Sequence, residues 1–87
     1  MKLKDELELI VKKDEDISRL DNAQVKELLD IADGLLTNDR KGQARIVEAR
    51  RALLSPKYVG GNAETLAIDF PEDWQDWCII VLNHLED

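Results

Sequence analysis

The sequence predicts an all-α protein: a compact antiparallel bundle of four helices, or of five if residues 62–69 form a short helix. Apolar residues recur at helical spacing along most of the chain, and the segment ends carry capping residues or proline. The 87 residues suit one domain, because so short a chain cannot divide its apolar side chains between two cores. We therefore expect a single helical domain over residues 1–87.

The first predicted helix begins at the amino terminus of the chain. Its apolar residues follow i, i+4, i+7 and i+8 spacing, which gives a helix one apolar side: Leu3, Leu7, Ile10 and Val11. Residues 14–16 are three consecutive acids, which repel one another and the negative end of a helix dipole. The helix is predicted to break near them.

The second predicted helix starts at a capping residue, either Asp21 or Asn22, with Gln24 placed to complete a capping box. Its apolar residues keep 3-4 spacing throughout: Val25, Leu28, Leu29, Ala32, Leu35 and Leu36. Thr37, Asn38 and Asp39 supply a stop and the cap of the next helix.

The third predicted helix covers residues 40–54 and ends at Ser55-Pro56, because a residue before proline avoids helical dihedral angles. Its expected apolar side consists of Ile46, Val47, Ala49, Leu53 and Leu54. Arg50 falls inside this side, so we expect it to pair with a carboxylate at the edge of the core.

Residues 62–70 allow two interpretations. Alternation of Leu66, Ile68 and Phe70 with more polar residues suits a half-buried strand, whereas residues 62–68 also suit a short capped helix. A lone strand has no hydrogen-bonding partner, which favours a short helix or an extended segment lying on the bundle. Gly60-Gly61 before it predicts a turn.

The last predicted helix starts at Pro71, with Asp69 or Phe70 near its cap. Its apolar stripe contains both tryptophans: Trp74, Trp77, Cys78, Val81, Leu82 and Leu85. The acids Glu72, Asp73 and Asp76 fall largely on the opposite half. Residues 78–82 could instead form a buried strand, which would make the fold α+β.

Charge is unevenly distributed along this chain of net charge -7. Residues 1–33 hold ten acids and six bases, residues 34–61 two acids and six bases, and residues 62–87 seven acids and no base. Such a surface disfavours direct contact with nucleic acid, whose affinity comes from neutralising many phosphates. It favours a basic protein partner through long-range attraction.

Several other classes of function lack a signature. Cys78 and His84 lie six residues apart on different sides of one predicted helix, and Gly60-Gly61 lacks the spacing of a phosphate-binding loop. We expect no enzyme, metal or cofactor. A single cysteine suits the reducing cytoplasm, and the longest apolar run, residues 78–82, is far too short for a membrane span.

The tryptophans have two interpretations. They can simply be the largest side chains of the core, or one can lie at its edge as an aromatic anchor within an acidic rim. Ile79 and Ile80 widen the apolar arc of the same helix beyond what a surface helix needs. The residues we expect to bind a partner are Glu72, Asp73, Trp74, Asp76, Trp77 and Ile80.

The functional hypothesis is a small acidic inhibitor that docks on a basic surface of a larger nuclease or nucleic-acid-binding complex. In length and acidity the chain is similar to bacteriophage anti-CRISPR and other anti-defence proteins, and to the immunity proteins that neutralise nuclease toxins. Two alternatives stay open: a regulator that contacts nucleic acid through Arg45 and Arg51 of the basic third helix, and a structural or homodimeric subunit that associates through Ile79, Ile80 or a tryptophan.

Overall fold

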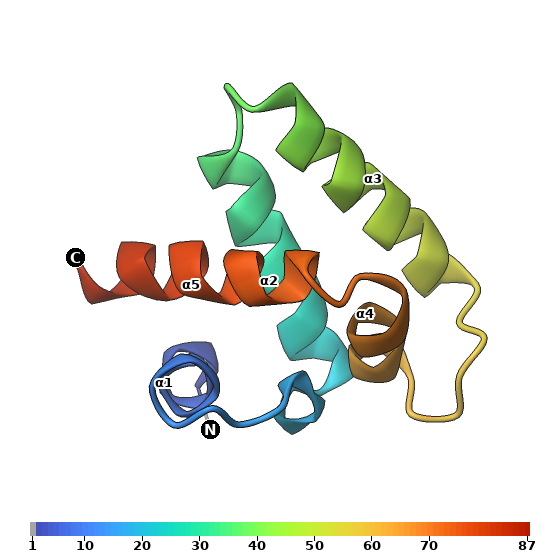
Figure 1. The fold of residues 1–87 in the computed structure, drawn as a ribbon, viewed down its shortest axis with the longest axis horizontal. Coiled ribbons are helices and arrows are strands. Elements are labelled where there is room, and N and C mark those ends of the chain that lie inside the picture. Colours follow the sequence, from blue (N-terminus) through green and yellow to red (C-terminus); the bar gives the residue numbers. More distant parts are fainter. Residues whose placement is uncertain (1) are drawn as a thin grey trace.

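The computed structural model describes residues 2–87, and this part of the chain is helical without a strand. In order (Figure 1), the elements are α1 (Leu3–Lys12), a 3-10 helix η1 (Ile17–Arg19), α2 (Asn22–Leu35), α3 (Arg40–Leu54), α4 (Asn62–Asp69) and α5 (Asp73–Glu86). The all-α prediction is confirmed in its five-helix form. Neither segment with an alternative strand interpretation, 62–70 or 78–82, is a strand: residues 62–69 and 78–82 are helical, and Phe70 is the C-cap of α4.

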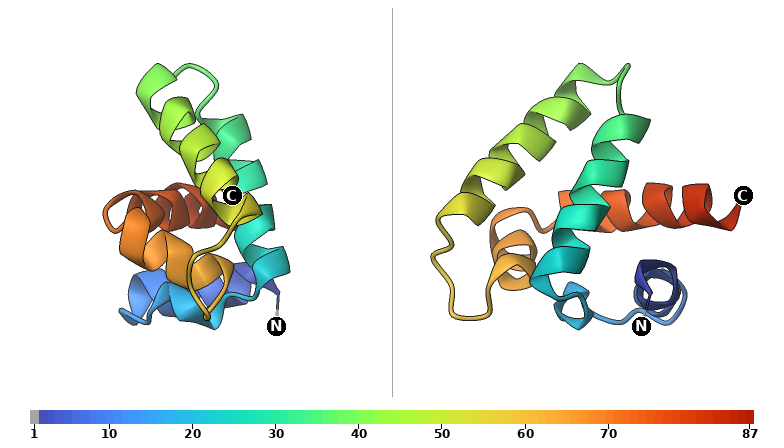
Figure 2. Two further views of the ribbon diagram at one scale, coloured as in Figure 1. Left: turned by 90° about the vertical axis from the view of Figure 1, so that its right-hand side faces the viewer. Right: turned by 180° about the vertical axis from the view of Figure 1, so that it is seen from behind.

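The helices cross one another at wide angles (Figures 1 and 2). α2 and α3 are joined by a short turn, run in opposite directions and separate with distance from the turn. α4 packs against both of them between their far ends. α5 lies across α2 and packs most extensively on α1, and the axes of α1 and α5 cross at a wide angle. The result is a compact body with extents of 33 × 30 × 20 Å.

Short polar residues begin α2 and α3 much as the sequence predicts. Asp21 and Gln24 form the capping box of α2, with the Asp21 carboxylate accepting from the Gln24 N–H at 2.8 Å. Asp39 caps α3 by accepting from the Gly42 N–H at 2.9 Å. Asp16, from the acidic run after α1, accepts from the Ser18 N–H and starts η1, an element that the apolar pattern did not indicate.

The core lies where α1, α2 and α5 meet, with α4, η1 and one side of α3 closing it. Its largest fully buried side chains come from every helix: Leu7, Ile17, Leu28, Leu29, Ile46, Leu66 and Leu82. One carboxylate is also buried. Glu6 accepts a hydrogen bond from Arg19 Nε at 2.7 Å, so the buried carboxylate is paired with a cation at the edge of the core.

The start of α5 differs from the prediction. The helix begins at Asp73 instead of Pro71, and neither Asp69 nor Phe70 caps it with a side chain. The reason is that both residues end α4, which extends to Asp69 and has Phe70 as its C-cap. The Asp69 carboxylate accepts from the Tyr58 hydroxyl at 2.9 Å, and the Phe70 ring is buried in the core. Pro71 therefore occupies the tight turn between α4 and α5.

The expected apolar side of α3 is only partly correct. Ile46 and Ala49 are buried, but Val47 is 46% and Leu54 84% exposed. α3 packs against α2 and α4 along one narrow side, where Leu53 is half-buried against the core, and Val47 and Leu54 lie outside this side. Arg50 pairs with Asp30 across the α2–α3 interface at 2.7 Å, which confirms the predicted carboxylate partner.

Candidate functional site

The six residues expected to bind a partner lie on and beside the first half of α5, in different environments. Glu72 and Asp76 are exposed, and Trp74 and Ile80 are half-buried against the core. Trp77 is only 3% exposed and packs against the Phe70 ring, with 6.2 Å between ring centroids. The core interpretation therefore describes Trp77, whereas Trp74 lies at the edge of the core.

Asp73 holds α5 to α3. Arg45 donates to one oxygen of this carboxylate from Nε at 3.0 Å and from Nη2 at 2.9 Å. The guanidinium also lies 4.8 Å from the centroid of the Phe70 ring and bonds Glu48 from its third nitrogen. The bond to Asp73 raises the pKa of Arg45. Asp73 thus has a cationic partner within the protein, whereas the structure of residues 2–87 shows none for Asp76.

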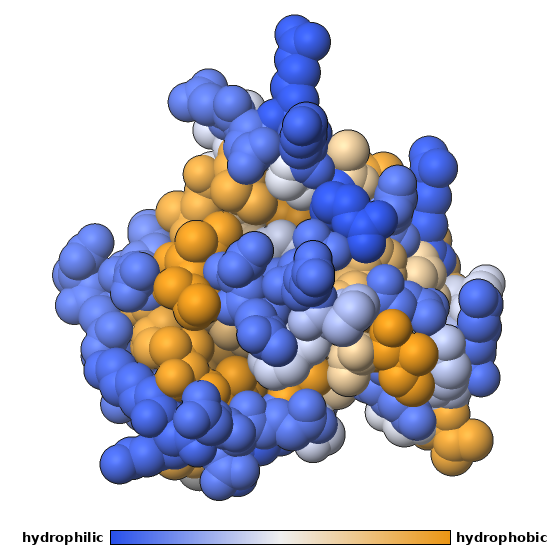
Figure 3. All heavy atoms as spheres, in the orientation of Figure 1, coloured by the Kyte–Doolittle hydropathy of each residue, from blue (hydrophilic) through white to orange (hydrophobic). Residues whose placement is uncertain are grey.

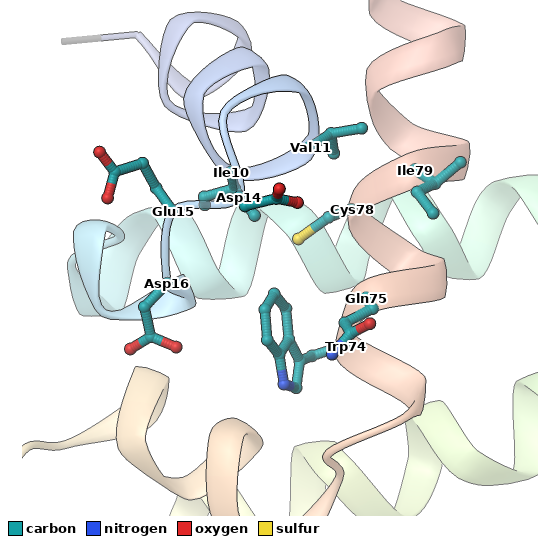
Figure 4. Close-up of a pocket in the computed structure, with 9 residues that line it drawn as sticks. All are labelled: Ile10, Val11, Asp14, Glu15, Asp16, Trp74, Gln75, Cys78 and Ile79. Atoms are coloured by element: carbon teal, nitrogen blue, oxygen red, sulfur yellow. The ribbon is translucent and has the colours of Figure 1, made fainter.

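A groove of about 380 Å³ separates α5 from the acidic turn after α1. Trp74 and Cys78 border it from α5, Ile10 and Val11 from α1 (Figure 4). Its remaining lining residues are Asp14, Glu15, Asp16, Gln75 and Ile79. We call it the Trp74 groove. It combines an apolar floor with carboxylates along one edge.

A second groove, of about 330 Å³, lies on the other side of α5 beside the α2–α3 turn. We call it the Leu36 groove; it is lined by Leu36, Asp39, Gly42, Asp73, Asp76, Trp77, Ile79 and Ile80. Ile79 borders both grooves and is 44% exposed. It therefore forms a ridge between two hollows, each with apolar and acidic walls.

The electrostatics of this face are one-sided. Each groove is lined by three carboxylates, and among residues 2–87 no lysine, arginine or histidine lines either of them. Asp73 is paired with Arg45, and Asp16 and Asp39 cap helices. For the other three, Asp14, Glu15 and Asp76, the structure of residues 2–87 shows no ion pair, so their charges face solvent.

Figure 3 shows how the apolar surface is arranged on this side of the molecule. An apolar area extends over α5, between the end of α2 and α1, and hydrophilic side chains surround it. Partly buried apolar residues also line the two grooves beside α5: Val11 and Trp74 the Trp74 groove, Leu36 and Ile80 the Leu36 groove. An exposed apolar surface with a charged border is typical of protein-binding faces.

The thiol beside the Trp74 groove is protonated at neutral pH. Cys78 borders the Trp74 groove, but its burial raises the pKa of the thiol to about 12, so it carries no thiolate at neutral pH. Within residues 2–87, no group of three or more His, Cys, Asp or Glu side chains is placed to hold a metal ion. Nor does any of the described helices have the length and apolar content to cross a membrane.

Sequence reasoning missed about half of this face. It located the contribution of α5 but not that of residues 10–16 or of Leu36 and Asp39, which only the packing of helices brings beside it. One signal was present: the acidic run at 14–16 directly follows the apolar residues Ile10 and Val11. That adjacency places charge at the end of an apolar stripe, but it does not say which helix lies opposite.

Fold and surface together define a class: a small all-helical protein with two carboxylate-lined apolar grooves on one face. No family model, curated protein or solved structure matches the chain.

Proposed function

We propose that the protein is a small acidic inhibitor that docks with its α5 face on a basic surface of a larger nucleic-acid-handling protein and blocks that surface. The observation that carries this proposal is the combination of an exposed apolar ridge at Ile79 with three groove carboxylates, Asp14, Glu15 and Asp76, for which the structure of residues 2–87 shows no ion pair. Inhibitors of bacterial defence complexes and immunity proteins against nucleases are the types of protein that such a surface would suit.

Occlusion follows from electrostatics. Exposed carboxylates such as Glu15 and Asp76 can occupy arginines and lysines that otherwise hold phosphates, so the partner loses its contacts with nucleic acid. The net charge of -7 attracts a basic surface from a distance and raises the association rate. Apolar contacts around Ile79 and Trp74 then slow dissociation, because they remove apolar surface from water.

The basic helix α3 gives less support to direct binding of nucleic acid. Arg45 is engaged by Asp73 and Glu48, and Arg50 by Asp30. Exposed bases such as Arg40 and Lys41 remain on this helix, but acids from α2 and α5 neutralise its middle. A phosphate approaching α3 would have to compete with these carboxylates.

The proposal is tested by capturing partners from a host lysate at low salt with the tagged protein and with Glu15→Lys/Asp76→Lys. Asp14 is left unchanged because its φ of 56° suits Asp better than Lys. The matched control is Glu27→Lys/Asp87→Lys, which makes the same charge change at exposed positions that line neither groove. We expect a nucleic-acid-binding protein that salt elutes, that the control retains and that the groove variant loses.

A gel shift with the captured protein then tests inhibition. The wild-type protein should release the partner's nucleic acid, and Glu15→Lys/Asp76→Lys should need at least about tenfold more protein for the same release. A partner that keeps its nucleic acid at saturating inhibitor would refute the proposal, as would capture that is identical for both charge variants.

A further inference from the structure

We infer that the segment received by the two grooves is a basic amphipathic α-helix, whose apolar side chains on successive turns straddle Ile79. This inference rests on the proposed function and names the partner structure that fits the same face. It follows from three features: the shape of the face, the pairing of apolar and acidic walls, and the absence of a strand edge among residues 2–87.

The shape of the face suits a partner with two apolar side chains, one for each groove, and a space between them for Ile79. Ile79 borders the Trp74 groove on one side and the Leu36 groove on the other. Side chains at i and i+4 of a helix are separated by about 5–6 Å and leave a space into which a residue of a crossing helix can insert. A partner helix lying across α5 can therefore place one side chain in each groove and receive Ile79 between them.

The acidic residues of the groove walls indicate that the partner helix carries positive charge. In the Trp74 groove, the Trp74 indole and Ile10 lie beside the acidic turn at 14–16, and in the Leu36 groove Ile80 lies beside Asp76. A lysine or arginine next to an apolar anchor can lay its methylene groups on the apolar wall and bring its charge to the carboxylates. The Trp74 ring can also attract a cation to its face.

Other occupants fit this face less well. An extended peptide adds to an open sheet edge, and the structure of residues 2–87 contains no strand. A nucleic acid or an anionic lipid surface would meet the carboxylates of both grooves and be repelled. A second copy docking through the same face would oppose acids to acids, because a two-fold interface uses one surface twice. Helix-in-groove recognition remains.

The test uses a synthetic helical peptide of leucine and lysine, about two heptads long, with leucines at i, i+3, i+4 and i+7. A peptide of the same composition in scrambled order keeps the charge but has no apolar side. We expect calorimetry to show at least about tenfold tighter binding of the helical peptide. In NMR spectra, its addition should shift the Trp74 indole N–H and Ile79 methyl signals, while the Ile68 methyl on α4 should stay in place.

The decisive variant is Ile79→Glu. Its matched control is Ile68→Glu, because both isoleucines are about half exposed and only Ile79 borders the grooves. If the basic peptide bound through charge alone, an added carboxylate would strengthen binding. Weaker binding of Ile79→Glu therefore shows that the peptide makes apolar contacts at this position. We expect Ile79→Glu to weaken helical-peptide binding about tenfold or more and Ile68→Glu to leave it unchanged. Circular dichroism checks that both variants are folded.

The outcomes separate this inference from the proposed function. Equal affinity for the helical and scrambled peptides, or binding that Ile79→Glu does not weaken, would overturn the helix inference even if salt-sensitive capture of a nucleic-acid-binding protein succeeds. If that capture fails but the helical peptide binds tightly and depends on Ile79, the helix inference holds and the proposed inhibition is refuted.

Discussion

Single residues on α5 show how burial decides the role of a side chain. Trp74 and Trp77 are of the same type and three residues apart, yet Trp77 is enclosed by the core and Trp74 borders a groove. Their spacing turns them about 60° apart on the helix, so a boundary between core and surface can pass between them. The sequence supported both interpretations because it does not show where the neighbouring helices end.

Cys78 gives a prediction at this scale. Burial raises the pKa of its thiol from 9.0 to about 12. Only the thiolate reacts readily, so the folded protein at pH 8 should resist a chromogenic thiol reagent, and the protein in denaturant should react with one equivalent. Complete reaction of the folded protein within minutes would contradict this assignment.

The same thiol makes stability depend on pH. Because folding raises this pKa, the neutral thiol favours the folded state. Its contribution is complete below about pH 9 and is lost as pH rises from 9.0 towards 12. Urea unfolding at pH 7 to 11 should therefore show a smaller alkaline loss for Cys78→Ala than for the wild type, although the variant starts from a lower stability.

At the scale of elements, local signals predicted the helices well and their packing less well. The capping box at Asp21 and the cap at Asp39 are local hydrogen bonds, and both were visible in the sequence. Val47 and Leu54 follow the apolar spacing of α3 but are exposed, because periodicity identifies a side of a helix without providing an element to cover it. Glu6 was missed for the converse reason: its partner, Arg19, lies on another element.

The link between α3 and α5 gives a prediction at the scale of elements. Asp73→Asn and Asp76→Asn remove the same charge from the same helix turn, but only Asp73 accepts two bonds from Arg45. The pair is partly exposed, so Asp73→Asn should lower the free energy of unfolding by about 1 kcal/mol and Asp76→Asn by less than about 0.5 kcal/mol. Urea denaturation measures both. Equal losses would show that the Arg45 contact adds nothing to stability.

This difference also determines which residue can test docking. A change at Asp73 releases Arg45 and alters the contact between two helices, so weaker partner binding would have two causes. Asp76 is exposed and lacks such a contact in the described structure. A change at Asp76 therefore tests docking without altering a contact between helices.

Across the whole molecule, folding rearranges the charge that the sequence distributes by segment. Two of the six bases of the central segment, Arg45 and Arg50, pair with acids of α5 and α2, so part of the positive region is neutralised internally. The acids at 14–16 and 76 gather around the grooves, although many residues separate them in sequence. Composition predicted an acidic protein, but only helix packing determines which acids share a face.

Stability should also be unevenly distributed over the molecule, which is the last prediction. α1, α2 and α5 share the core, whereas α3 buries only Ile46 and Ala49 fully and packs sparsely on α2 and α4. Regions with few buried contacts open with a lower free energy than the core. Backbone amides in residues 48–54 should therefore exchange with deuterium faster than those in residues 77–82.

Two core truncations make this prediction sharper. Ile46 and Leu82 are both almost completely buried, so each change to alanine should cost about 2–5 kcal/mol where the site is well packed. Ile46→Ala should accelerate exchange mainly in α3, because α3 can open while the rest stays folded. Leu82→Ala should accelerate it in α1, α2 and α5 together. If both variants accelerated exchange equally in all helices, the protein would open as one cooperative unit, and α3 would belong to the core on the same terms as α5.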